Sequence, residues 1–180
     1  MSTTKSEPTI FVIFGGTGDL NSRKIAPALY NLFLDGWLPK QFSIIGTGRT
    51  KLDDDKFRDN LHNDINQFSR SGKADEKKWA EFSSNIYYQV SDATDAETYK
   101  EFGKRIDKHN AEWKTKANVI FYLAVAPNFF PIIASNIAKA KLAEDKERVR
   151  IIIEKPFGHD LESAQKLNKD ILKNLQEHQI

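Results

Sequence analysis

The stretch TIFVIFGGTGDLN, from Thr9 to Asn21, decides the fold of this 180-residue chain. Its apolar run, Ile10–Phe14, predicts a buried β-strand, and the glycine-rich turn Gly15–Gly18 follows it directly. A segment with helical spacing comes next. Together, a buried strand, a glycine turn and a helix N-terminus can hold a diphosphate, because small residues let the backbone approach the phosphates and the helix dipole attracts the anion. The stretch therefore predicts a nucleotide-binding α/β fold.

Composition restricts the possible functions. The chain has 27 lysines and arginines against 25 aspartates and glutamates, so its charge of +2 predicts neither nucleic acid nor a membrane surface as a partner. It has no cysteine, which excludes disulfides and thiolate zinc sites and fits a cytoplasmic protein. The four histidines lack metal-ligand spacing, and we expect no metal site. Three of them lie in polar helical stretches, where exposed side chains are expected: His62, His109 and His178.

Strand and helix patterns alternate along the whole chain. Apolar runs predict five strands, at residues 10–14, 42–45, 86–90, 119–125 and 149–154. Helical spacing predicts six helices, at residues 19–34, 53–68, 76–82, 95–113, 128–141 and 160–177. Near-continuous apolar strands joined by helices indicate a Rossmann-type, doubly wound and mostly parallel sheet with helices on both faces. We expect residues 1–8 to be a flexible tail, residues 9–180 to be one domain, and Gln179-Ile180 to be the start of another strand.

The glycine turn departs from the usual G-x-G-x-x-G pattern, because Asn21 occupies the third glycine position. Its place at the first strand–helix junction still favours coenzyme binding over a purely structural turn. The candidate coenzyme-binding residues of this turn are Gly15, Gly16, Thr17, Gly18, Asp19 and Leu20.

The end of the second strand indicates which coenzyme binds. NAD-binding versions of this fold usually place a carboxylate about 20 residues after the glycine turn, where it holds the ribose 2′-hydroxyl. Here the strand ends Gly46-Thr47-Gly48-Arg49-Thr50, and no carboxylate occurs before Asp53. A guanidinium at Arg49 can grip a 2′-phosphate with two hydrogen bonds. We therefore favour NADP, the alternative being that Arg49 is an ordinary surface residue.

Three further segments follow strands and so should lie on the same carboxyl edge of the sheet. Asp92 and Ala93 follow the third strand and are candidates for the adenine end, although Asp92 could equally be a turn aspartate. Ala126 and Pro127 either contact the coenzyme or only end the fourth strand. Lys155, after the fifth strand, is placed to reach a substrate hydroxyl or the nicotinamide.

The motifs together resemble the glucose-6-phosphate dehydrogenase family. Gly15–Leu20, with Lys24 five residues after Asp19, is similar to the family's opening motif. Ile45–Arg49 resembles the segment whose arginine contacts the NADP 2′-phosphate, and Phe121–Pro127 resembles the fourth strand and its nicotinamide-side loop. Glu154–Gly158 resembles the family's most recognisable short motif in this region. The matches come in the family's order from Ile10 to Ile180.

The resemblance implies an activity. Members oxidise β-D-glucose 6-phosphate to 6-phosphogluconolactone, the first step of the pentose phosphate pathway. A histidine general base removes the C1 hydroxyl proton while hydride passes to the nicotinamide. Lys155 matches the lysine that contacts both sugar and coenzyme, and Lys24 matches a lysine near the same junction. Both are therefore candidate catalytic residues.

The resemblance also implies what this chain lacks. The family's next motif, Arg-Ile-Asp-His-Tyr-Leu-Gly-Lys, and the α+β domain with the general base are expected beyond Ile180. We therefore expect the chain to be a coenzyme domain that binds NADP weakly, does not turn over and is monomeric, within a parent that forms homo-oligomers. The alternative is a free-standing NADP-binding or redox-sensing module without catalysis. A short-chain reductase is disfavoured, because the sequence has no Tyr-x-x-x-Lys pair.

Overall fold

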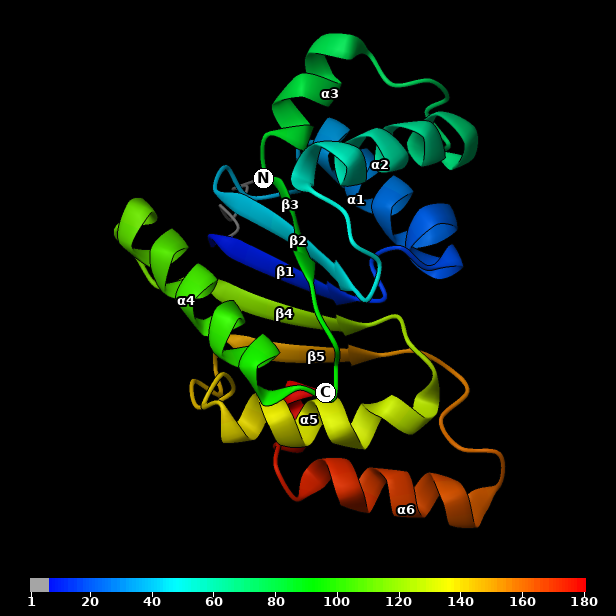
Figure 1. The fold of residues 1–180 in the computed structure, drawn as a ribbon, viewed down its shortest axis with the longest axis vertical. Coiled ribbons are helices and arrows are strands. Elements are labelled where there is room, and N and C mark those ends of the chain that lie inside the picture. The colour runs from blue at the N-terminus through cyan, green and yellow to red at the C-terminus, as the bar shows by residue number, and fades with distance from the viewer. Residues whose placement is uncertain (1–6) are drawn as a thin grey trace, which may run out of the picture.

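The computed structural model describes residues 7–180, which form a five-stranded parallel sheet of order β3-β2-β1-β4-β5 (Figure 1). All four neighbouring pairs are parallel. The strands are β1 (Thr9–Phe14), β2 (Phe42–Gly48), β3 (Ile86–Val90), β4 (Asn118–Leu123) and β5 (Val149–Ile153). The order reverses between β1 and β4, the position at which open α/β sheets bind ligands. The predicted Rossmann-type fold is confirmed.

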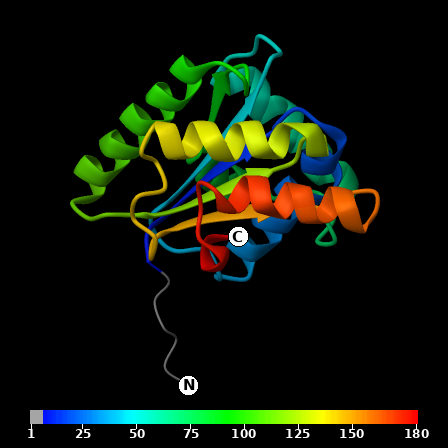
Figure 2. The same cartoon turned by 90° about the horizontal axis from the view of Figure 1, so that it is seen from below.

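Six α-helices cover the two faces of the sheet (Figures 1 and 2). One face carries α1 (Ala26–Leu34), α2 (Asp54–Phe68) and α3 (Glu76–Ser83). The opposite face carries α4 (Ala96–Trp113), α5 (Phe130–Lys139) and α6 (Leu161–Leu172). Three short segments complete the described chain: the π-helical turn η1 (Asn21–Ile25) and the 3₁₀ turns η2 (Pro127–Phe129) and η3 (Glu177–Gln179).

Each face of the sheet has its own apolar core, because side chains alternate between faces along a strand. In β1, Val12 and Phe14 pack with α4, α5 and α6, whereas Ile13 packs with α1, α2 and α3. The neighbouring strand β2 follows the same rule: its Ile45 and Ile44 lie on opposite faces. Burial on both faces explains why the strands read as continuous apolar runs.

The first described residues, Glu7 and Pro8, are bonded to this body. Residues 1–6 of the expected tail lie outside the described residues. Pro8 accepts a hydrogen bond at its carbonyl from the Asn118 amide at 2.7 Å, and Glu7 pairs with Arg148 at 2.8 Å. No helix within residues 7–180 combines the length and apolar character needed to cross a membrane.

The helix expected over residues 19–34 is not a continuous α-helix. Its first part widens into η1, in which the Ala26 amide bonds to the Asn21 carbonyl five residues back. Pro27 follows at the start of α1. Proline has no amide hydrogen and its ring crowds the carbonyl four residues before it, so the α-type bond to Arg23 cannot form. A wider turn accommodates that loss.

The last predicted helix was too long. Asp160 caps α6 as expected, accepting from the Ser163 amide at 2.8 Å, but α6 ends at Leu172. The expected strand at Gln179-Ile180 is also wrong, because Gln179 belongs to η3 and its side chain bonds back to the Ala143 carbonyl. This buried amide ties the end of the described chain to the segment before β5.

Candidate functional site

The carboxyl ends of the five parallel strands form one edge of the sheet, and the predicted site residues follow these ends. In spatial order they are Asp92 after β3, Arg49 after β2, the glycine turn after β1, Pro127 after β4 and Lys155 after β5. Strands in a sheet lie about 4.8 Å apart, so the edge spans roughly 20 Å. An extended dinucleotide fits that length.

Main-chain bonds fix the glycine turn to the end of β2. The amides of Gly15 and Gly16 both donate to the carbonyl of Thr47, at 3.0 and 2.8 Å. The Gly18 amide then donates to the Gly15 carbonyl at 2.9 Å and closes the turn. Thr47 was not among the predicted site residues, since a main-chain acceptor leaves no mark on the sequence.

The first two glycines are required by close backbone approach. Gly15 has a φ of +81°, and a Cβ there would lie 2.2 Å from the Ala124 carbonyl oxygen after β4. A Cβ on Gly16 would lie 2.8 Å from the Thr47 nitrogen and 2.9 Å from the Gly46 Cα. Any larger side chain would therefore push the turn away from its two neighbouring strands.

The helix start beyond the turn leaves amides for an anion. The first helical bond runs from the Ser22 amide to the Gly18 carbonyl at 3.1 Å. The amides of Gly15, Gly16 and Gly18 are already bonded, whereas those of Thr17 and Asp19 have no acceptor among residues 7–180, and their partial positive charge favours a phosphate. The Asp19 carboxylate points to solvent and pairs with Arg23 at 3.4 Å. The turn thus fits a diphosphate group, with a buried backbone cradle and free donors.

Asn21, which replaces the third glycine of the usual G-x-G-x-x-G pattern, contacts the glycine turn directly. It is 1% exposed, and its Nδ2 donates to the Gly16 carbonyl at 2.6 Å. Its Oδ1 has no hydrogen-bond partner in the described structure. A glycine in this position would allow close helix–strand packing. The asparagine instead binds back to the turn.

Arg49 and Asp92 come together at the ends of β2 and β3. Arg49 is exposed, and Gly48 before it lies against Thr17 of the turn, so a Cβ on Gly48 would be 3.3 Å from the Thr17 Oγ1. The pKa of the Asp92 carboxyl is lowered, chiefly by hydrogen bonds from Thr94 and to a smaller extent by the Arg49 charge. Both Thr94 donors lie 2.8 Å from the Asp92 Oδ1, so Asp92 acts here as a turn aspartate.

The next segments line the middle of the edge. Ala93 is partly buried, and its carbonyl accepts from the Tyr99 hydroxyl at 2.6 Å and from Asn136 at 3.4 Å. Ala126 is exposed, whereas Pro127 is partly buried and begins η2. Asn136 of α5 therefore links the loop after β3 to the helix that follows β4.

Lys155 is exposed at the end of β5, next to Glu154. The Glu154 carboxylate accepts a hydrogen bond from the Tyr122 hydroxyl of β4. Burial and this carboxylate raise the pKa of Tyr122 to about 12. The Lys155–Pro156 peptide bond is cis. Lys24 is likewise exposed, on η1 beside α2.

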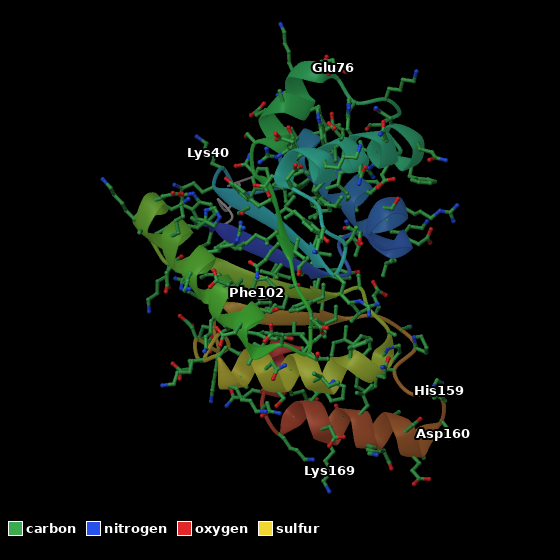
Figure 3. All side chains as sticks on the ribbon, in the orientation of Figure 1. Lys40, Glu76, Phe102, His159, Asp160 and Lys169 are labelled. Atoms are coloured by element: carbon green, nitrogen blue, oxygen red, sulfur yellow. The ribbon has the colours of Figure 1, made fainter. Side chains whose placement is uncertain are left out.

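Of the four histidines, His159 lies nearest in sequence to Lys155. Figure 3 places His159 and Asp160 at the amino end of α6, on the side to which the strand arrows of Figure 1 point. His159 donates its amide to the Ser163 Oγ at 2.8 Å and is exposed. The prediction for His109 was wrong. It is 9% exposed and lies 3.1 Å from the Ser43 Oγ, because it faces β2 rather than solvent.

Comparison with known proteins identifies the family. The family model described as "Glucose-6-phosphate dehydrogenase, NAD binding domain" matches residues 12–180. Two curated relatives named glucose-6-phosphate 1-dehydrogenase are similar in sequence. The one from Bacillus subtilis is 36% identical over 180 residues, covering 100% of this chain and 36% of that protein. The one from Chlamydia muridarum is 35% identical over 178 residues, covering 96% and 35%.

The fold agrees with this match. A solved structure of glucose-6-phosphate dehydrogenase in complex with its substrate glucose-6-phosphate superposes with a TM-score of 0.87 and 34% identity, covering 99% of this chain and 37% of that one. The chain spans about a third of the length of the curated relatives it matches. Since sequence and fold agree along nearly the whole chain, it belongs to the glucose-6-phosphate dehydrogenase family and matches that family's NAD-binding domain.

Proposed function

We propose that this chain is the coenzyme-binding part of an NADP-dependent glucose-6-phosphate 1-dehydrogenase. The complete enzyme would oxidise β-D-glucose 6-phosphate to 6-phosphogluconolactone, the first step of the pentose phosphate pathway. Family membership supports the reaction. The observation that supports NADP is Arg49, an exposed guanidinium beside the turn, with no carboxylate between Gly46 and Leu52 to hold a ribose 2′-hydroxyl.

The residues of the carboxyl edge would divide the coenzyme between them. The diphosphate would lie on the turn Gly15–Leu20, where the close backbone packing and the free amides of Thr17 and Asp19 fit it. Arg49 would hold the 2′-phosphate, with Asp92 and Ala93 near the adenine. Ala126 and Pro127 would lie beside the nicotinamide ring, which accepts a hydride when the coenzyme is bound.

Lys155 would serve the reacting end. Its ammonium group follows β5, two strands from the glycine turn, and Glu154 beside it is already bonded to Tyr122. A cation there can donate hydrogen bonds to a sugar hydroxyl and to the nicotinamide amide, and so orient one against the other. Lys24, on η1, would have a secondary role near the same junction.

We propose further that residues 1–180 bind NADP as a monomer but do not turn over by themselves. In the curated relatives about two thirds of the length lies outside the matched part, which leaves room for a general base, a sugar-phosphate site and an oligomer interface. The cysteine-free composition supports a cytoplasmic setting for the parent enzyme.

Two measurements on the 180-residue chain test this proposal. Calorimetric titration with NADP and NAD should give tighter binding of NADP, by about tenfold or more for one charge-assisted contact. Absorbance at the reduced-nicotinamide band, with glucose 6-phosphate present, should stay constant. Equal affinities would remove Arg49 from the proposed role. Steady turnover would show that the catalytic groups lie within this chain.

A further inference from the structure

Asn21 holds the carbonyl of Gly16 in the glycine turn. Its side-chain amide reaches back five residues and donates to the Gly16 oxygen at 2.6 Å, and the residue is 1% exposed. The Gly16 amide is also occupied, since it donates to the Thr47 carbonyl at 2.8 Å. Both polar groups of Gly16 are therefore fixed by named partners on opposite sides of the turn.

Fixing the Gly16 carbonyl also fixes the Thr17 amide. The two groups belong to one peptide unit, which is planar. This unit is trans, since the cis bond of the described chain is Lys155–Pro156. In a trans unit the C=O and N–H bonds point in opposite directions. With the carbonyl directed at Asn21, the Thr17 N–H is directed away from the helix body. Thr17 is exposed, and its amide has no acceptor within residues 7–180.

A second observation is that Asn21 carries a cost to stability. Its Oδ1 is buried and has no donor among the described residues. An unsatisfied buried acceptor is costly, and native structures contain few of them. A small apolar side chain would avoid that cost at this position. The asparagine also begins η1, and such π-type turns are frequent at functional sites.

We propose that Asn21 is a positioning residue for the coenzyme diphosphate. It orients the Gly16–Thr17 peptide unit so that the Thr17 N–H is presented to the phosphate before the coenzyme arrives. This role rests on the proposed coenzyme binding. It also explains how the turn keeps its shape although the third glycine of the usual pattern is replaced.

The proposal predicts that loss of the Asn21 side chain weakens only those ligands that carry a diphosphate. NADP carries both a diphosphate and a 2′-phosphate, whereas adenosine 2′-monophosphate carries only the latter. Replacing Asn21 by alanine frees the Gly16–Thr17 unit to rotate. We expect the Asn21→Ala variant to bind NADP about tenfold more weakly, the loss of one charge-assisted hydrogen bond. Binding of adenosine 2′-monophosphate should change by less than about twofold, because Arg49 and the loop after β3 remain intact.

Asn31 supplies the matched control. It is 9% exposed, and its Nδ2 donates to the Pro27 carbonyl at 2.8 Å within α1. Asn31→Ala removes the same kind of bond away from the turn, together with a bond that its Oδ1 accepts from the Ser69 hydroxyl at 3.1 Å. Both variants should lose stability, but only Asn21→Ala should change the ratio of the two affinities. Equal losses for both ligands in Asn21→Ala, or none, would overturn the proposal.

A measurement on the unmodified chain covers the case in which Asn21→Ala does not fold. The ¹⁵N-labelled protein is titrated with each ligand, and the Thr17 amide proton is followed by NMR. It should move downfield with NADP and stay in place with adenosine 2′-monophosphate. If the chemical shift of the Thr17 amide proton does not change when NADP binds, the proposed role of Asn21 is refuted. If the unmodified chain binds neither ligand, it is the proposed coenzyme function that fails.

Discussion

The hydroxyl of Tyr122 on β4 donates a hydrogen bond to the carboxylate of Glu154, the residue that follows β5. The bond joins neighbouring strands at the carboxyl edge, one residue before Lys155. It supplies a donor to the Glu154 carboxylate, which is partly buried and would otherwise lose a partner that water gives it. It also fixes the main chain from which the proposed substrate-contacting lysine extends.

This pair leads to a titration prediction. Burial is the first cause that raises the pKa of Tyr122 to about 12, and hydrogen bonding and charge from Glu154 add to it. Glu154→Gln removes the charge and keeps an acceptor, so the Tyr122 phenol should ionise at lower pH than in the unmodified chain. ¹³C-labelled tyrosine NMR across alkaline pH measures this. Tyr99, raised to about 12 mainly by burial, is the internal control and should not move.

Arg49→Ala tests the choice of coenzyme. If the guanidinium reads the 2′-phosphate, NADP binding should weaken by about 1–3 kcal/mol, while NAD binding stays nearly constant. Calorimetric titration of both coenzymes measures the difference. Lys40→Ala is the matched control, because it removes a positive charge just before β2, away from the arrowheads of Figure 1 (Figure 3). The same loss for NAD and NADP would count against a phosphate contact.

Lys155→Ala is best tested in a complete enzyme that carries this chain as its first part. We expect kcat to fall by two orders of magnitude or more, on the scale of a lost positioning and charge contribution, with little change in NADP affinity. Lys169→Ala, an exposed lysine on α6, should leave both unchanged. A variant with near-normal kcat would take Lys155 out of the site.

Gly15→Ala should destabilise the fold more than an alanine at a comparable glycine. Gly15 and Gly36 both have positive φ, at +81° and +73°, which costs a non-glycine residue about 1–2 kcal/mol. Only Gly15 faces a backbone oxygen at 2.2 Å from the new Cβ, whereas Gly36 has open space. Urea unfolding of Gly15→Ala should therefore show an added loss beyond that of Gly36→Ala. Similar losses of unfolding free energy in the two variants would mean that the turn can shift away from β4 and make room for the new Cβ.

His109 should make the fold sensitive to mild acid. Burial is the main cause that lowers its pKa from 6.5. The Glu112 charge raises this pKa, and the charges of Lys108 and Arg105 lower it further. Because the unfolded chain binds a proton more readily, the free energy of unfolding should fall as pH drops from 6.5 toward the lowered pKa. Urea unfolding at pH 7.5 and 5 measures this. His109→Gln should flatten the dependence, and the exposed His178→Gln should not.

Much of the fold followed from local patterns. The helix at α2 was predicted from its apolar spacing, and Asp53 caps its first turn by accepting from the Lys56 amide at 2.7 Å. Asp95 and Asp160 cap α4 and α6 in the same way. β2 is longer than its apolar run: the strand was predicted to end before Gly46, but it continues to Gly48, and Gly46 packs against Phe57. The sequence alone does not distinguish a glycine that makes room for a neighbouring side chain from a glycine that ends a strand.

The rest of the site depends on residues far apart in the chain. His109 faces Ser43, 66 residues away, and no helical pattern contains that partner. Thr47 holds the glycine turn through its carbonyl alone, which its residue type does not reveal. Asn21 was predicted only as a departure from the glycine pattern, and the structure shows its bond to Gly16. The sequence could locate the strand ends at which ligands bind. It could not say which main-chain groups there are already used and which remain free.

The Thr47 carbonyl that holds the glycine turn has a consequence for how this coenzyme site can change over generations. The bonds from Gly15 and Gly16 to Thr47 use main-chain atoms alone, and the Tyr88 side-chain hydroxyl donates to the main-chain carbonyl of Thr50 at 2.9 Å. The three residues Arg49 to Lys51 are exposed. A descendant can exchange their side chains singly while the turn keeps its anchor. Preference among coenzymes can therefore drift in small viable steps, independently of the capacity to bind one at all.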